Sequence, residues 1–244
     1  MVSSDVPSPP PASEGFVIAA GLRASRATLE RWRRDPAPVL VPWFAGALAI
    51  SVALLAAVWA VSRLTTPDPT PVTLPGINDV SGFDDYAHIL GRNLLVLALH
   101  ATACVAGFIA GSALPAEANE HTGPWRRVHQ LAGPVAIAFV AAATLFSLGM
   151  QALVLGSDAS TLAHQLDVGP ALLILTLLPH ALPELVALFL PLAAWLVASR
   201  RGRFDELLAA TVATTALAVP VLVAAALVEV FVWPGLLRAA SPLA

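Results

Sequence analysis

The stretch LLPHALPELVALFLP, Leu177–Pro191, decides how this chain is read, because it sets two ionisable side chains inside a strongly apolar run. His180 and Glu184 stand four residues apart, a spacing that puts them on one face of a continuous helix. Pro179 and Pro183 lie beside them, and proline removes a backbone donor and clashes with the preceding turn. We therefore expect a membrane-spanning helix that is either kinked or broken into two halves near mid-bilayer.

The composition of the whole chain indicates an integral membrane protein. Of its 244 residues, 57% are hydrophobic and only 12% are charged, whereas about a quarter of an ordinary soluble domain is charged. The net charge of −3 and the lack of a basic surface argue against a nucleic-acid partner. All 13 cationic residues are arginine, which points to GC-rich coding DNA and hence to a bacterium. The single cysteine, Cys104, excludes a disulfide within the chain.

Five segments are long enough to cross a hydrocarbon core of about 30 Å, which needs about 20 apolar residues. They run near Val39–Val61, His88–Leu114, Val128–Leu155, Gly169–Ala198 and Glu206–Trp233. The expected fold is therefore all-α and polytopic, with five transmembrane helices.

The chain divides into four parts on the same reading. A polar, proline-rich tail at 1–15 is predicted to be disordered, and 16–36 is predicted to form a basic amphipathic helix on the membrane surface. The five-span domain covers 37–235, and 236–244 is expected to be a short tail.

The distribution of arginines predicts the orientation. Ten of the 13 precede the first span, separate the second from the third, or separate the fourth from the fifth. The exceptions are Arg63, Arg92 and Arg238. The positive-inside rule then places the N-terminus in the cytoplasm and the C-terminus outside, in a bacterial inner membrane.

Several ionisable residues lie within the spans, where each costs several kcal/mol unless it faces other helices or water. We expect a polar cluster built by the second, fourth and fifth spans, and Arg92 and Glu229 are predicted to pair because they lie at similar depth. The candidates are Arg92, His100, His180, Glu184 and Glu229.

Three roles are open to such a cluster. The preferred interpretation is a polar clamp that fixes how the helices pack. A proton relay or substrate gate is the second, and a metal site of two histidines and a carboxylate is the third. The chain has no HExxH, GxSxG or GxxxxGKT pattern, so we predict no enzyme activity, no metal and no cofactor.

Small and aromatic residues carry two further predictions. In AGFIAGSA, Gly107 and Gly111 stand at GxxxG spacing, which suits an internal contact or a homodimer face, with the internal contact preferred. Trp43, Trp125 and Trp233 lie at span ends and are expected to anchor at the headgroups.

The opening stretch resembles a known family. LPHALPEL, Leu178–Leu185, looks like the proline–histidine–glycine–x–x–glutamate–leucine signature of the stage II sporulation protein M family, although Ala181 stands where that family has glycine. AALVEVFVWP, Ala225–Pro234, resembles the family's closing run. Asn93 matches a polar residue of its early segment and so joins the cluster. The resemblance covers roughly 83–234.

The resemblance implies a multi-pass protein that acts inside a membrane complex. In endospore formers the named member works with cell-wall hydrolases during engulfment, but relatives occur in bacteria that never sporulate. We therefore expect a non-enzymatic subunit or scaffold of a bacterial envelope complex, whose partners are other membrane proteins and the bilayer. The alternative is a permease-like or proton-coupled transport component, and an intramembrane enzyme using His180 and Glu184 is a third reading.

Overall fold

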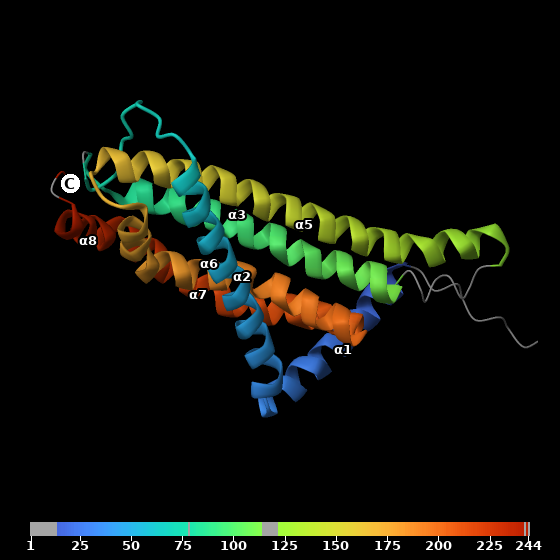
Figure 1. Ribbon diagram of the computed structural model, residues 1–244. Helices are drawn as coiled ribbons and strands as arrows, with labels where there is room; N and C mark the ends of the chain where they lie inside the picture. Colours follow the sequence, from blue (N-terminus) through green and yellow to red (C-terminus); the bar gives the residue numbers. More distant parts are fainter. Residues whose placement is uncertain (1–13, 78, 114–121, 242, 244) are drawn as a thin grey trace, which may run out of the picture.

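The computed structural model describes residues 14–77, 79–113, 122–241 and 243, and within them every regular element is a helix (Figure 1). The elements are α1 (Glu14–Arg34), α2 (Ala37–Leu64), α3 (Phe83–Phe108) with its π-helical continuation η1 (Ile109–Ala113), α5 (Pro124–Gln165), α6 (Pro170–Arg201), the 3₁₀ turn η2 (Phe204–Glu206), α7 (Leu207–Phe231) and α8 (Trp233–Ala240).

Five of these stretches are long and apolar enough to cross a membrane. They are Ala37–Leu64, Phe83–Ser112, Arg126–Gln165, Pro170–Arg201 and Phe204–Phe231. The predicted all-α polytopic fold with five spans is confirmed. The helix predicted at 16–36 is α1, and its place on a membrane surface stays a prediction; residues 1–13 of the predicted tail lie outside the described residues.

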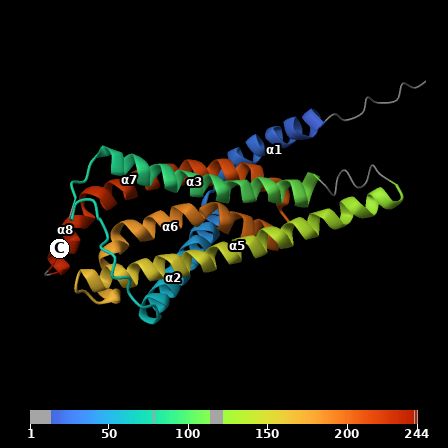
Figure 2. The ribbon, with the colours of Figure 1, turned by 90° about the horizontal axis from the view of Figure 1, so that it is seen from above.

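The bundle has two ends, visible in Figures 1 and 2. At one end, here called the α8 end, the loop 65–82 and the residue after α8 meet the end of α5. The backbone N–H of Asp68 donates to Thr161 Oγ1 in the last turns of α5 at 3.0 Å, and Ser241 Oγ donates to the Leu166 carbonyl at 2.5 Å. At the opposite end, the α1 end, the Arg31 guanidinium lies 3.3 Å from the Glu206 carboxylate.

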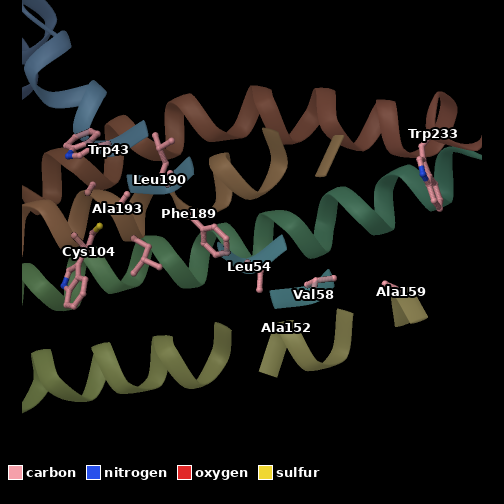
Figure 3. Packing of buried hydrophobic residues seen from close by; sticks show 14 of the residues in the cluster. Trp43, Leu54, Val58, Cys104, Ala152, Ala159, Phe189, Leu190, Ala193 and Trp233 are labelled. Atoms are coloured by element: carbon pink, nitrogen blue, oxygen red, sulfur yellow. The ribbon is translucent and has the colours of Figure 1, made fainter. Parts of the chain in front are cut away.

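Helix α6 is the centre of the bundle. Over half of its most apolar stretch, 56%, is buried inside the protein, against 6% for α5. Its Phe189, Leu190 and Ala193 are each at most 1% exposed, and Figure 3 shows them among side chains from neighbouring helices. Cys104 of α3 donates its thiol proton to the Pro191 carbonyl, with a sulfur–oxygen distance of 3.1 Å.

Helix α6 runs unbroken from Pro170 to Arg201 although Pro179, Pro183 and Pro191 lie inside it. Of the two predicted forms, the continuous helix is the one found. Packing against α2, α3 and α7 on several sides holds the helix together where propensity alone would end it, as tertiary contacts often do.

Helix α5 runs much further than predicted, and part of the predicted C-terminal tail is helical. Helix α5 has 42 residues, about 63 Å at 1.5 Å per residue, and continues past the expected limit at Leu155. Its last turns are held to the loop, because Ser160 Oγ donates to the Thr65 carbonyl at 2.9 Å. Residues 236–240, expected in a tail, belong to α8, where Leu237 is fully buried.

The small and aromatic residues turn out to serve internal packing. A Cβ added at Gly107 would lie 2.7 Å from the Trp195 ring of α6, so this glycine makes an internal contact, as preferred. Trp43 and Trp233 are only 5% and 7% exposed and pack inside the protein, so the expectation that their rings anchor at headgroups is wrong. The side chain of Trp125 lies outside the described part.

Candidate functional site

A cavity of about 700 Å³ lies between α2, α5 and α6, beneath the loop 65–82. Its walls are mainly aliphatic, with side chains such as Leu54, Val58, Leu162 and Leu177. Along α6 it extends from Leu173 to Leu185, about 18 Å at the helical rise. This volume is in the usual range for a small-molecule site, and the length carries it from the α8 end to the middle of α6.

His180, Glu184 and Glu229 all line this cavity. The first two share a face because α6 is continuous across their four-residue spacing. Glu229, near the end of α7, reaches the same space. The structure therefore brings three of the predicted polar residues to the border of one cavity.

The His180 ring is buried and packed against a neighbouring ring, but its Nδ1 atom has no hydrogen-bond partner among the described residues. Its side chain belongs to a residue only 4% exposed, and no partner for Nδ1 is found among the described residues. The ring packs edge-on against Trp233, with centroids 5.9 Å apart. The Trp233 Nε1–H donates to Thr176 Oγ1 at 3.3 Å. Buried polar atoms are nearly always hydrogen-bonded in native proteins, so an unpartnered Nδ1 is an unusual feature of this site.

The two carboxylates interact with each other and with α3. Glu184 interacts electrostatically with Glu229 and with Asn93, and Glu229 interacts with Arg92. Within the described residues, however, the ion pairs closer than 4.0 Å are Arg31–Glu206 and Arg203–Glu206. The predicted contact pair of Arg92 with Glu229 is therefore absent, because Arg92 is exposed and acts on Glu229 from a greater distance.

His100 does not join the group that lines the cavity. It lies on α3 with its ring 5.4 Å from that of Phe189, on the side of α6 that packs against α3. Equal depth in the membrane predicted a shared cluster, but depth does not determine which way a side chain points around a helix. The polar residues therefore fall into a cavity group and a separate histidine.

Two acidic residues of the cavity, Asp68 and Asp158, were missed by sequence reasoning. The predicted third span ended at Leu155, so Asp158 was assigned to a loop. Had the helix been continued, Leu155, Asp158 and Leu162 would have fallen on one face by their spacing of three and four. Asp68 lies in a loop, where no periodicity reveals contacts.

Asp68 is negatively charged at the mouth of the cavity. It accepts a hydrogen bond from the backbone N–H of Thr70 at 2.8 Å, and this bond lowers the pKa of Asp68 below its ordinary value. The carboxylate is therefore ionised at neutral pH, and a cluster of like charges at a mouth raises the local concentration of oppositely charged solutes.

The metal alternative has no support in the described part of the chain, which contains no group of three or more His, Cys, Asp or Glu side chains placed to hold an ion. The same carboxylates and imidazole can instead act as hydrogen-bond acceptors and as a negative electrostatic site.

Comparison with known proteins agrees with the resemblance noted in the sequence. The model of the family described as stage II sporulation protein M matches residues 131–234. Over this segment, which is less than half of the chain, the sequence is similar to that family. The match contains His180, Glu184 and Glu229, whereas the predicted start near residue 83 is not reached and Asn93 lies outside it. No curated protein and no solved structure matches the chain.

Proposed function

We propose that this protein is a membrane transport component, whose cavity admits a small molecule from the α8 end and delivers it to Glu184. The observation that carries the proposal is the continuity of one 700 Å³ cavity from the loop 65–82 to Glu184 and Glu229. Polar groups near mid-membrane, on a proline-containing helix, are a common construction of transporter sites.

The hydrogen bonds and ion pairs of the polar residues favour a transport function over a purely structural role as a clamp between helices. A clamp stabilises helices through satisfied interhelical hydrogen bonds. Here His180 Nδ1 has no partner among the described residues, and neither Glu184 nor Glu229 makes a close ion pair there. Groups that hold helices together would be paired with one another, whereas groups that receive a solute remain free until it arrives.

The orientation and partners follow from the same proposal. The positive-inside distribution of arginines supports a cytoplasmic α1 end and an external α8 end in a bacterial inner membrane, so the cavity opens to the outside. The chain carries no GxxxxGKT loop. A second protein that hydrolyses ATP, or an ion gradient, therefore supplies the energy.

Helix α5 supports a second candidate, the envelope scaffold predicted from sequence. Only 6% of its most apolar stretch is buried, and Phe139, Leu145 and Phe146 are each more than 70% exposed. Lipid covers such a face equally well, but a helix of another membrane protein packing there would make the chain an assembly subunit. The two candidates are compatible, since α5 lines the cavity with its last turns, from Leu155 to Leu162, and not with this exposed stretch.

Cysteine labelling tests the transport proposal. In a Cys104→Ser background, Ala181→Cys places a thiol on the cavity wall one turn from Glu184. A membrane-impermeant cationic methanethiosulfonate added outside the cell is expected to modify it. Leu175→Cys is the control, because Leu175 is closer to the α8 end on the same helix but is 60% exposed and does not line the cavity. Absence of labelling at residue 181 would overturn the proposal.

A further inference from the structure

We propose that the α1 end of the protein binds anionic phospholipids, whose phosphate groups are held by exposed arginines of α1 and α6. This surface lies at the opposite end of the bundle from the mouth of the cavity, so the inference is independent of the proposed transport function. It assigns a partner to the basic segment of α1, which lies outside both the cavity and the family match.

The packing of α1 on the bundle leaves its arginines on the outside. Helix α1 contacts α7, and its Ser25 and Thr28 are each only 6% exposed. Trp32 packs edge-on against a tryptophan ring of α2. These three residues follow one another at spacings of three and four, so they form one face of α1, which is turned toward the bundle. Arg33 and Arg34 lie off this face, and both are exposed.

The charge at this end is positive and only partly neutralised by the protein itself. From Arg23 to Asp35 and from Arg200 to Glu206, eight arginines stand with four carboxylates. The close ion pairs within the described chain are Arg31–Glu206 and Arg203–Glu206, so two arginines share one carboxylate. The exposed arginines of the last turns of α1 and α6 form no such pair there; they are Arg33, Arg34, Arg200 and Arg201. An excess of exposed cations attracts anions.

The place of these arginines along the helices favours a lipid over an acidic protein. Arg34 stands three residues before Ala37, where the first spanning helix begins, and Arg201 is the last residue of the fourth. Both therefore lie within about one helical turn of an apolar span, which is the depth of the lipid headgroups. Arginine clusters directly beside a spanning helix are typical binding sites for anionic lipids.

A small hollow next to the arginines supplies the apolar part of the surface. Helices α1, α2, α6 and α7 border it, and its volume of about 20 Å³ is the space of about one water molecule. Trp32, Val39 and Val197 line it together with Arg201 and Arg203. It is too small to enclose a headgroup, so the lipid lies across it. Apolar and basic side chains side by side match the part of a phospholipid where hydrocarbon meets phosphate.

Lipid binding by the full-length protein in nonionic detergent tests the proposal, with native mass spectrometry measuring the bound fraction. The probes are dioctanoyl phosphatidylglycerol, which is anionic, and dioctanoyl phosphatidylcholine, which has the same chains and no net charge. Phosphatidylglycerol is expected to bind about tenfold more tightly, and Arg33→Gln combined with Arg201→Gln is expected to weaken it about tenfold. Arg126→Gln combined with Arg127→Gln is the matched control, because it removes two exposed arginines from the start of α5, and it should leave binding unchanged.

Equal binding of the two lipids, or the same phosphatidylglycerol binding in the two double variants, would overturn the proposal. The unmodified protein decides the matter if a variant fails to fold. Raising the salt concentration from about 50 to about 500 mM should weaken phosphatidylglycerol but not phosphatidylcholine, because salt screens exposed charges, and binding that salt leaves unchanged refutes the role of the arginines. A hexaglutamate peptide is the third probe. If it binds more tightly than phosphatidylglycerol and displaces it, the surface belongs to an acidic protein and the lipid proposal is wrong.

Discussion

The surroundings of Glu184 and Glu229 are those expected of a functional site and not of a purely structural contact. Each carboxylate is partly withdrawn from water, and the two repel each other across the cavity. Neither is compensated by a close cation within the described chain. Such an arrangement costs folding free energy, and proteins commonly retain costly groups where function requires them.

Glu184→Gln is therefore expected to stabilise the protein. Removing one of two repelling carboxylates should raise the free energy of unfolding by about 1 kcal/mol, measured by chemical denaturation in detergent. Arg92→Leu is the opposing control, because it removes the guanidinium that acts on Glu229 and should lower stability. If Glu184→Gln instead costs about 2 kcal/mol or more, the carboxylate acts as a clamp and the transport reading loses its main support.

At the scale of elements, the close approach of α3 to α6 and α7 fixes the bundle opposite the cavity. Gly107 makes this approach possible, since a Cβ there would lie 2.7 Å from the Trp195 ring and 2.8 Å from Leu207 Cδ1. Neither neighbour is free to move, because both are buried. The absence of a side chain at this position thus determines how near the helices come.

Gly107→Ala should destabilise the protein by about 1–3 kcal/mol, the usual cost of inserting a methyl group into a packed core. Thermal unfolding of the purified protein measures it. Gly91→Ala on the same helix is the matched control, because nothing lies within 4 Å of a Cβ placed there. Equal effects at the two positions would show that helix propensity, and not the contact with Trp195, accounts for the change.

At the scale of the whole molecule, an odd number of spans places α1 and α8 at opposite ends (Figure 1). The α1 end carries an arginine-rich helix whose Arg31 contacts Glu206 at 3.3 Å and whose Trp32 packs edge-on against Trp43, with centroids 5.2 Å apart. Exposed ion pairs contribute little, so the aromatic contact provides more of the attachment of α1 to the bundle.

Reporter fusions test the orientation. A periplasmic phosphatase fused after Ala244 is expected to be active, and the same enzyme fused after Arg201 is expected to be inactive, because the arginines at the α1 end retain that side in the cytoplasm. A fluorescent protein that matures only in the cytoplasm should give the reverse pattern. The opposite result would show that the α8 end, and with it the cavity, faces the cytoplasm. A solute would then enter the cavity from the cytoplasm and not from outside.

The sequence alone determined that this is a membrane protein, how many helices span the membrane, and which residues are costly to bury there. Runs of about 20 apolar residues are required by the thickness of a bilayer, and this requirement is local, so five spans could be counted without knowing any contact. His180 and Glu184 were recognised for the same reason, since an ionisable group in an apolar run is visible in a single segment.

Only the tertiary structure decided which of those residues meet. It placed Glu229 beside Glu184, left His100 against Phe189, and brought Asp68 and Asp158 to the same cavity. The physical reason is that depth along a helix follows from residue number, whereas the direction of a side chain around the helix acquires meaning only from its neighbours. The cavity belongs to no single segment: it is the space that α5 and α6 leave when both pack against α2.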